Sequence, residues 1–312
     1  RSGRLTEPTI AICVVTYNSA DLIRELVASI PAGAAGTRWT LVFADNASTD
    51  DTLGEIARQA PDAVVVEVGG NRGYAAGINA AVRAVVPHGG YLILNPDVRL
   101  HTGCVATLYR ALSTTNGIAV PRLLDARGEL IWSRRREPTL LRAWADALVG
   151  AERVGTMAAL GEVVSDPTAY SSSGPTDWAE GSTQLVSAAC WAACGPWDED
   201  FFLYSEEADF DLRAGDAGLE TWFIADAVAT HLEGGSAGSP RLWSLLSVNR
   251  VRLFRKRHGR IASGLFWAAT VWREGSRALL GRATARAAIR DLVSRRRLRQ
   301  SPSPEWLDGV SV

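Results

Sequence analysis

Two groups of side chains in this sequence have the residue types needed to bind a metal and to move a proton. The first, Asn95-Pro96-Asp97, ends the apolar run Tyr91-Leu92-Ile93-Leu94. Four apolar residues in a row predict a core strand, which Pro96 ends because proline has no ladder N–H and fixes φ. Asp97 then lies at the carboxyl edge of a sheet, where α/β sheets bind ligands and where oxygen ligands suit a hard divalent cation. Alone, the tripeptide also fits an ordinary Asn/Asp turn.

The second group is the segment from Glu199 to Asp211, in which acidic residues alternate with aromatic ones. Burial and neighbouring negative charge raise the pKa of such a carboxyl group, which then can act as a general base. The same acids also fit a helix start, where carboxylates interact favourably with the helix dipole.

A single histidine, His231, follows the strand-like segment 220–228 and precedes Gly234-Gly235-Ser236. Its neutral imidazole can ligate a cation, and the loop's N–H groups and the Ser236 hydroxyl can receive phosphate oxygens. A lone histidine is also common as a purely structural residue.

Alternating strand and helix patterns in the first hundred residues must position these groups. Apolar strands are expected at 9–15, 39–44, 64–68 and 91–94, and helices at 21–30, at 53–57 and at 75–86. Continuous apolar strands joined by helices predict an α/β fold with a mostly parallel sheet that is buried on both faces.

Polar side chains follow three of these strands, namely Asp45, Asn71 and Asp97. Because parallel strands end at one edge, the three groups should converge on a crevice that suits a nucleotide, with Asp45 accepting from a base imide N–H. Backbone amides near Gly73 and Gly77 can approach a phosphate closely, since no Cβ intervenes. A glycine-rich turn is equally common as a simple helix entry.

The remainder predicts an appendage. Residues 121–176 are irregular and are interpreted as a helix-containing insertion with a loop over the active face, and the chain is expected to be helical after Pro240. We therefore expect a catalytic domain at 1–240 and a helical extension at 241–312. Residues 250–299 carry fourteen Arg and one Lys against two acids, a net +13 in a chain of net charge −1. This asymmetry indicates an anionic surface as partner.

Seven motifs occur in order between Ile10 and Ser236: Val14–Asn18, Ala44–Asp50, Asn71–Asn79, Leu94–Asp97, Trp178–Ser182, Trp197–Phe202 and His231. Together they closely resemble glycosyltransferase family 2, in its bacterial rhamnosyltransferase-like branch. The resemblance implies a GT-A fold, which is a Rossmann-like, mostly parallel sheet with flanking helices, here with a helical C-terminal extension. It also implies inverting, metal-dependent transfer of a sugar from a nucleotide donor to a hydroxyl.

The resemblance assigns a role to each motif. Asp97 and His231 resemble the ligands of a divalent cation, Mg²⁺ or Mn²⁺, and Glu207 occupies the position of the general base, although the family usually has aspartate there. The nucleotide and donor contacts implied are Thr16, Tyr17, Asn18, Asp45, Asn71, Gly73, Tyr74, Gly77, Asn79, Asn95 and Asp97. The acceptor and sugar pocket implied is Trp178, Gly181, Glu206 and Asp209.

The expected donor is dTDP-rhamnose, with a UDP-sugar such as UDP-galactofuranose as the alternative. The expected acceptor is a glycan or a polyprenyl-diphosphate-linked cell-envelope precursor. A catalytically weak nucleotide-sugar-binding scaffold is a different class of function that the glutamate substitution leaves open. Nucleic-acid binding is not expected, because no readout motif accompanies the basic segment.

We expect a cytoplasmic protein that lies peripherally on the inner face of the cell membrane. The start, Arg1 to Pro8, has no signal-peptide pattern, no segment has the roughly eighteen apolar residues of a membrane span, and the four cysteines read as buried free thiols. The basic C-terminal segment, in which Trp and Leu alternate with Arg, fits an anionic membrane surface or, alternatively, a helical homo-oligomer interface.

Overall fold

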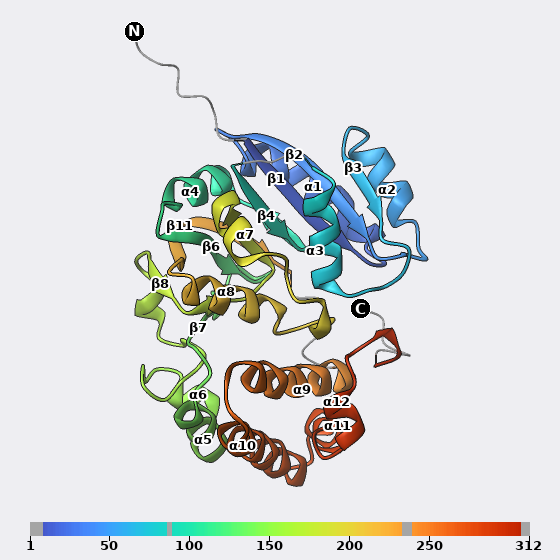
Figure 1. Ribbon diagram of the computed structural model, residues 1–312. Helices are drawn as coiled ribbons and strands as arrows, with labels where there is room; N and C mark the ends of the chain where they lie inside the picture. Colours follow the sequence, from blue (N-terminus) through green and yellow to red (C-terminus); the bar gives the residue numbers. More distant parts are fainter. Residues whose placement is uncertain (1–8, 86–88, 233–238, 307–312) are drawn as a thin grey trace.

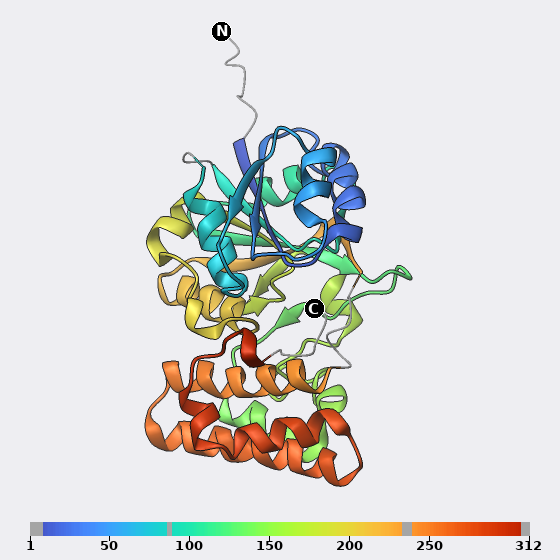
Figure 2. The same cartoon turned by 90° about the vertical axis from the view of Figure 1, so that its right-hand side faces the viewer.

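The computed structural model describes residues 9–85, 89–232 and 239–306. Its α/β part and its C-terminal helices form two layers of the molecule (Figures 1 and 2). Part of the predicted helix at 75–86 and of the loop after His231, including Ser236, lies outside the described residues.

The first four strands pair in parallel in the order β3-β2-β1-β4. Residues on β1 alternate between two buried clusters, with Ile10, Ile12 and Val14 on one face and Ala11 and Cys13 on the other. The sheet is therefore covered on both faces, as predicted. The elements are β1 (Thr9–Thr16), α1 (Ala20–Gly33), β2 (Arg38–Asp45), α2 (Thr52–Gln59), β3 (Val64–Glu67), α3 (Tyr74–Arg83) and β4 (Gly90–Leu94).

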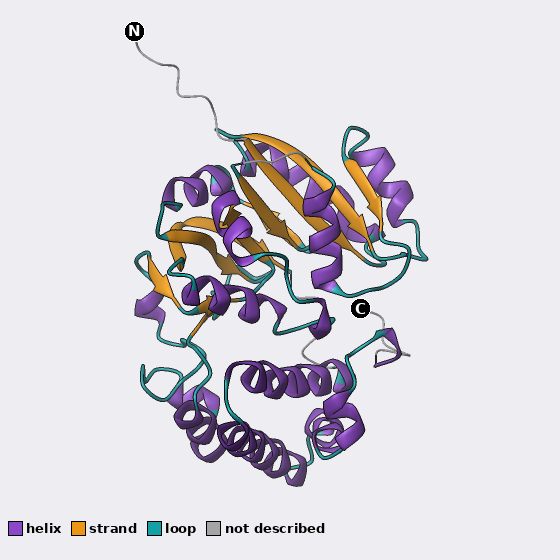
Figure 3. Ribbon diagram, in the orientation of Figure 1, coloured by secondary structure: helices purple, strands orange, loops and turns teal. Residues whose placement is uncertain are grey.

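Beyond β4 the sheet is mixed, in the order β4-β10-β6-β11-β5 with β8 beside β11. Strand β10 is antiparallel to both β4 and β6, while β6 and β11 are parallel. The elements are β5 (Val98–Leu100), α4 (Cys104–Ala111), β6 (Asn116–Leu124), β8 (Gly174–Thr176), β10 (Thr183–Ser187), α7 (Ala188–Cys194), α8 (Glu206–Asp216) and β11 (Glu220–His231). Figure 3 shows this sheet as one continuous layer.

The insertion only partly follows the sequence prediction. It contains helices, as predicted, in α5 (Leu140–Val149) and α6 (Ala151–Val154), and α5 packs against the C-terminal helices, a contact that the sequence did not predict. A two-stranded sheet of β7 (Arg134–Arg135) and β9 (Trp178–Ala179) joins the insertion to the segment that precedes β10.

The chain is helical from Pro240, as predicted, in α9 (Pro240–Arg257), α10 (Arg260–Leu279), α11 (Ala283–Leu292) and α12 (Arg295–Arg299). Many of its basic side chains bind acids elsewhere in the chain: Arg250 pairs with Glu162 at 2.5 Å, and Arg257 pairs with Asp216 at 2.7 Å. Much of the basic excess is therefore internal. In the described residues no helix is both long and apolar enough to cross a membrane. The four cysteines are free, and three of them are buried.

Candidate active site

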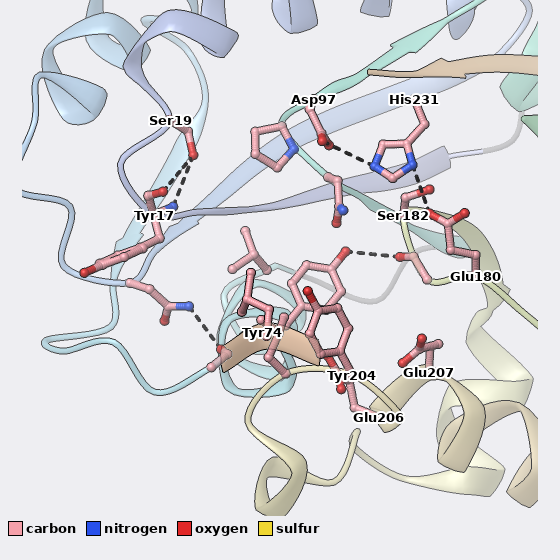
Figure 4. A pocket seen from close by; sticks show the side chains of 18 of the residues that line it. Tyr17, Ser19, Tyr74, Asp97, Glu180, Ser182, Tyr204, Glu206, Glu207 and His231 are labelled. Atoms are coloured by element: carbon pink, nitrogen blue, oxygen red, sulfur yellow. Dashed lines mark hydrogen bonds and ion pairs between the residues drawn. The ribbon is translucent and has the colours of Figure 1, made fainter. Parts of the chain in front are cut away.

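A cavity of about 520 Å³ lies at the carboxyl ends of β1 and β4, between the sheet and the start of α8 (Figure 4). Its volume is in the range of small-molecule and cofactor sites in proteins. Eleven of the residues predicted for the site line it: Tyr17, Asn18, Asn71, Gly73, Tyr74, Asn95, Asp97, Gly181, Glu206, Glu207 and His231.

Strand pairing brings the two predicted metal ligands together. Strand β11 runs antiparallel to β5, with His231 opposite Val98. Asp97 is the last residue of the turn between β4 and β5, so the imidazole lies beside it. His231 Nε2 is 3.3 Å from Asp97 Oδ2, and on the other side its Nδ1 is 2.9 Å from Glu180 Oε1. Burial alone would lower the pKa of His231, but the two carboxylates raise it to about 10.

Glu180 is the second carboxylate beside His231. The sequence analysis gave it no role, although it lies inside the Trp178–Ser182 motif. Burial alone would raise the pKa of its carboxyl group, yet contact with His231 lowers it below its ordinary value. A carboxylate that accepts from the second nitrogen of a metal-binding imidazole fixes the tautomer and orientation of the ring. Other cavity residues that the sequence did not single out are Asn46, Arg135, Ser182 and Tyr204.

The acidic pair lies on the side of the cavity opposite Asp97 and His231 in Figure 4. Burial, followed by the charge of Glu207, raises the pKa of Glu206 well above its ordinary value. Burial also raises the pKa of Glu207, to about 7. In the described residues Glu207 Oε2 is buried without a hydrogen-bond partner. The surroundings thus favour the protonated form of Glu206, and the pKa of Glu207 lies near neutrality.

Two glycines allow the close approaches that form the cavity wall. Gly73 has φ = +90°, and a Cβ there would lie 2.2 Å from the carbonyl oxygen of Phe202. A Cβ on Gly181 would lie 2.9 Å from the Glu207 Cβ. The side chain of Tyr74 spans the same wall, since its hydroxyl donates to the Gly181 carbonyl at 3.2 Å.

Six predicted contacts do not line the cavity: Thr16, Asp45, Gly77, Asn79, Trp178 and Asp209. Asp45 is 1% exposed, and its carboxylate accepts from the Thr16 hydroxyl at 2.9 Å and from the Ser48 N–H at 2.9 Å. As the structure stands, these groups hold the loop that follows β2 and leave Asp45 no free edge for a base.

The other four also support neighbouring structure. Asn79 holds Trp197 through both its amide atoms, and the Gly77 position lies against Val15, so these two fix α3 rather than face the cavity. Asp209 binds Arg213 at 2.8 Å and Lys256 at 2.7 Å. Trp178 donates to the Arg136 carbonyl at 3.1 Å. We therefore place Asp209 and Trp178 behind the cavity wall, not in a sugar pocket.

The donor set beside Asp97 is suited to a hard divalent cation. The Asn95 side-chain oxygen is buried in the cavity wall without a hydrogen-bond partner among the described residues. Within those residues no three His, Cys, Asp or Glu side chains converge as a complete metal cage. Mg²⁺ commonly takes only one or two carboxylates and completes its shell with water and substrate phosphates, so the sparse set at Asp97 and His231 fits that mode of binding.

Comparison with known proteins identifies the chain. Residues 11–157 match the family model "Glycosyl transferase family 2". The N-acetylglucosaminyl-diphospho-decaprenol L-rhamnosyltransferase of Mycobacterium tuberculosis is 27% identical over 243 residues, which cover 73% of this chain and 78% of the relative. Residues 11–157 are thus a family 2 glycosyltransferase segment.

Two further similarities agree with this identification. The low-salt glycan biosynthesis hexosyltransferase of Haloferax volcanii is 29% identical over 210 residues, which cover 66% of this chain and 61% of that protein. The mannosyltransferase of Pyrobaculum calidifontis, solved with GDP-Man and Mn²⁺, superposes with a TM-score of 0.58 at 19% identity and covers 91% of this chain and 74% of that one. The predicted GT-A fold is therefore confirmed.

Proposed function

We propose that this family 2 glycosyltransferase transfers L-rhamnose from dTDP-rhamnose to a hydroxyl of a lipid-linked glycan, with inversion at the anomeric carbon. The proposal is carried by one observation: a single cavity has the Asp97–His231 pair on one side and the buried Glu206–Glu207 pair on the other. The similarity to a rhamnosyltransferase whose name contains a decaprenol diphosphate supports the donor sugar and the acceptor class.

The acid pair supplies the proton chemistry. Glu207, with a pKa near neutrality, accepts the proton of the acceptor hydroxyl as that oxygen attacks the anomeric carbon. Burial and the charge of Glu207 raise the pKa of Glu206 well above its ordinary value, which disfavours two adjacent negative charges in the site. Attack from the side opposite the leaving nucleotide is a single displacement and therefore inverts the centre.

The Asp97 side of the cavity receives the diphosphate. Asp97 and His231 are the residues that would hold Mg²⁺ or Mn²⁺, which when bound supplies Lewis-acid neutralisation of the leaving group. Glu180, at 2.9 Å from Nδ1, orients the imidazole so that Nε2 faces Asp97. Tyr17, Asn18, Asn71 and Gly73 form the adjoining wall, where we place the nucleotide.

Calorimetry of the intact protein with dTDP-rhamnose and with UDP-galactofuranose, each with and without Mn²⁺, tests the donor. We expect metal-dependent binding of the thymidine donor. Preference for the uridine donor would move the assignment to a UDP-sugar transferase. If neither donor bound, a glycosyltransferase of another donor class would have to be considered.

Two variants test the assigned roles by transfer assay. We expect Asp97→Ala to abolish metal-dependent transfer, and Glu207→Gln to keep donor binding while losing turnover by at least a hundredfold. Binding without turnover in the unaltered protein would instead favour a nucleotide-sugar-binding scaffold. A Glu207→Gln enzyme with normal kcat would contradict the assignment of the base.

We further propose that residues 1–240 form the catalytic domain and that residues 241–312 dock it, peripherally, on the cytoplasmic face of an anionic membrane, where a lipid-linked acceptor resides. The support is an apolar stripe on α10, made of Ile261, Leu265, Trp272 and Leu279, which are 83%, 47%, 58% and 91% exposed. Spacings of four, seven and seven residues place them on one helix face. An amphipathic helix with exposed arginine nearby can lie in a membrane interface without spanning it.

A further inference from the structure

The turn before α8 has an unusual backbone. Phe202, Tyr204 and Ser205 have φ values of 63°, 70° and 76°, although none of them is glycine. Left-handed conformations at non-glycine residues persist only where the surrounding structure holds them, and they are frequent at functional sites. Something outside the turn must therefore stabilise it.

The turn is held by one side chain from the C-terminal helices. Asn249, in the middle of α9, is fully buried, and its Nδ2 donates to the carbonyl oxygens of Phe201 at 2.8 Å, Leu203 at 2.9 Å and Tyr204 at 3.1 Å. Asn249 lies far outside the segment that matches the family model. A single side-chain amide thus fixes three carbonyl groups of a turn whose residues do not favour its positive φ angles.

The same turn supports the acidic pair. The turn leads directly into α8, whose first two residues are Glu206 and Glu207, and the Ser205 carbonyl accepts from the Asp209 N–H at 2.9 Å in the first turn of that helix. On its other side the turn contacts the donor wall, since the Tyr74 N–H donates to the Phe202 carbonyl at 2.7 Å. The peptide groups that Asn249 fixes are therefore directly followed in the chain by the residues that carry the two carboxyl groups.

We propose that Asn249 is a positioning residue: its amide holds the strained 202–205 turn, and the turn places the Glu207 carboxylate for proton transfer. The inference rests on the proposed role of Glu207 as general base. It gives the C-terminal helices a part in catalysis, because α9 then contributes to the geometry of the acid pair. A displacement of a catalytic group by about 1 Å can lower a rate on the order of a hundredfold.

The first test compares two buried polar residues of the same helix. Ser244 is 1% exposed and donates to the Asp291 carboxylate of α11 at 2.7 Å, and among the described residues its side chain has no hydrogen bond to the turn. We expect Asn249→Ala to lower kcat at least tenfold with the donor KM within threefold, and Ser244→Ala to leave both within threefold. Equal losses in the two variants would overturn the proposal, because α9 would then act only as general scaffolding.

A rescue experiment separates strain from packing. Glycine tolerates positive φ at no steric cost, so Ser205→Gly reduces what the Asn249 amide has to stabilise. We expect Ser205→Gly to raise kcat at least threefold more in the Asn249→Ala background than in the unaltered protein. The same factor in both backgrounds would contradict the coupling.

Hydrogen exchange tests the turn without reference to activity. We expect amide exchange in the peptide that contains residues 202–210 to accelerate at least tenfold in Asn249→Ala and to be unchanged in Ser244→Ala. Unaltered exchange in Asn249→Ala would overturn the inference. If the unaltered protein transferred no sugar, the proposed function would fail, while this measurement would still decide whether Asn249 holds the turn.

Discussion

Glu206 and Glu207 are neighbours at the start of α8, and burial raises the pKa of both. Glu207 has a pKa of about 7, a value at which a carboxyl group is about half ionised at neutral pH and its carboxylate is basic enough to accept a proton. The longer side chain, where the family usually has aspartate, therefore still fits the chemistry of a base.

We expect the rate of transfer to depend on pH through Glu207. Below about pH 7 the carboxyl group is protonated and cannot accept the acceptor's proton, so kcat/KM should rise about tenfold per pH unit and level off above pH 7. Steady-state kinetics between pH 5 and 9 would measure the midpoint. A midpoint near the ordinary glutamate value of 4.5 would contradict the buried environment.

The Glu207 carboxyl group should lower the free energy of unfolding as the pH rises, over the range in which it raises the rate. A carboxyl group whose pKa is raised on folding favours the protonated native state, so its cost is absent below about pH 4.5 and complete above about pH 7. Glu207→Gln removes that cost. We expect the variant to gain up to about 3 kcal/mol in free energy of unfolding at pH 8, at about 1.4 kcal/mol per pKa unit, and to gain nothing at pH 4.

Gly181 determines how closely Glu207 approaches the cavity wall. Because a Cβ at Gly181 would lie 2.9 Å from the Glu207 Cβ, Gly181→Ala must shift the base, and we expect kcat to fall about ten- to a hundredfold. Gly174→Ala is the matched control, since a Cβ there meets nothing within 4 Å. Normal kcat in Gly181→Ala would show that Glu207 needs no close contact with the turn between β9 and β10.

At the residue scale, several site residues could be predicted because they lie at strand ends or inside recognisable motifs. Asp97 and His231 lie together as expected, because the turn after β4 and the end of β11 meet at one register. Asp45 and Asn79 were expected at the donor, but their hydrogen bonds point into the scaffold. The sequence cannot show which polar residue binds a ligand and which binds the scaffold, because an aspartate or asparagine can do either.

At the scale of elements, β1 to β4 could be predicted because their apolar runs are continuous and lie close together in sequence. The antiparallel insertion of β10 between β4 and β6 could not, since an apolar run does not reveal its direction or its partner. The partner of α5 was also unpredictable: its buried residue Ala143 belongs to the same cluster as Leu245 and Phe266, more than a hundred residues later. The role of Asn249 could not be predicted either, because its partners in the 201–204 turn are more than forty residues away in the sequence.

The packing of α10 on its neighbours depends on a buried acid. Glu274 is 0% exposed, accepts a hydrogen bond from Trp243 Nε1 of α9 at 2.9 Å and forms an ion pair with Arg273 at 3.0 Å. Glu274→Ala would leave the Trp243 Nε1–H without its acceptor and remove one of the two acidic partners of Arg273, so we expect a loss of about 1 to 3 kcal/mol in unfolding free energy by urea denaturation. Ser276→Ala, exposed on the same helix, should change it by less than about 0.5 kcal/mol. Equal midpoints for the two variants would contradict this role.

At the scale of the whole molecule, the C-terminal excess of positive charge has two uses. Part of it forms ion pairs with distant segments: Lys256 binds Asp198 and Asp209 of the α/β layer, and Arg273 binds Asp146 of α5 within the helical layer. Another part is exposed, with no acid in ion-pair distance among the described residues, at Arg260, Arg282, Arg286 and Arg290. A count of charges in the sequence cannot separate these two groups, because the acidic partners come from distant segments.

The exposed arginines lie at the start of α10 and along its neighbour α11, and together with the apolar stripe of α10 they predict membrane binding. We expect the intact protein to float with vesicles that contain anionic lipid, and to float less as salt is raised, because the arginine contribution is screened. Removing two exposed apolar side chains from the stripe should weaken binding at least tenfold, since a fully buried Leu or aromatic side chain contributes roughly 1.5–3 kcal/mol.

Two double variants make the test specific. Trp272→Ser/Leu279→Ser removes side chains that are 58% and 91% exposed on α10, whereas Trp39→Ser/Val65→Ser removes a matched pair, 40% and 43% exposed, from the α/β layer. Only the first pair should lose vesicle binding, and both should keep donor binding because neither lines the cavity. Equal flotation of both variants would contradict docking through α10. Loss of a dimer in the first variant, with no flotation of the unaltered protein, would assign the stripe to contact between two copies of the chain.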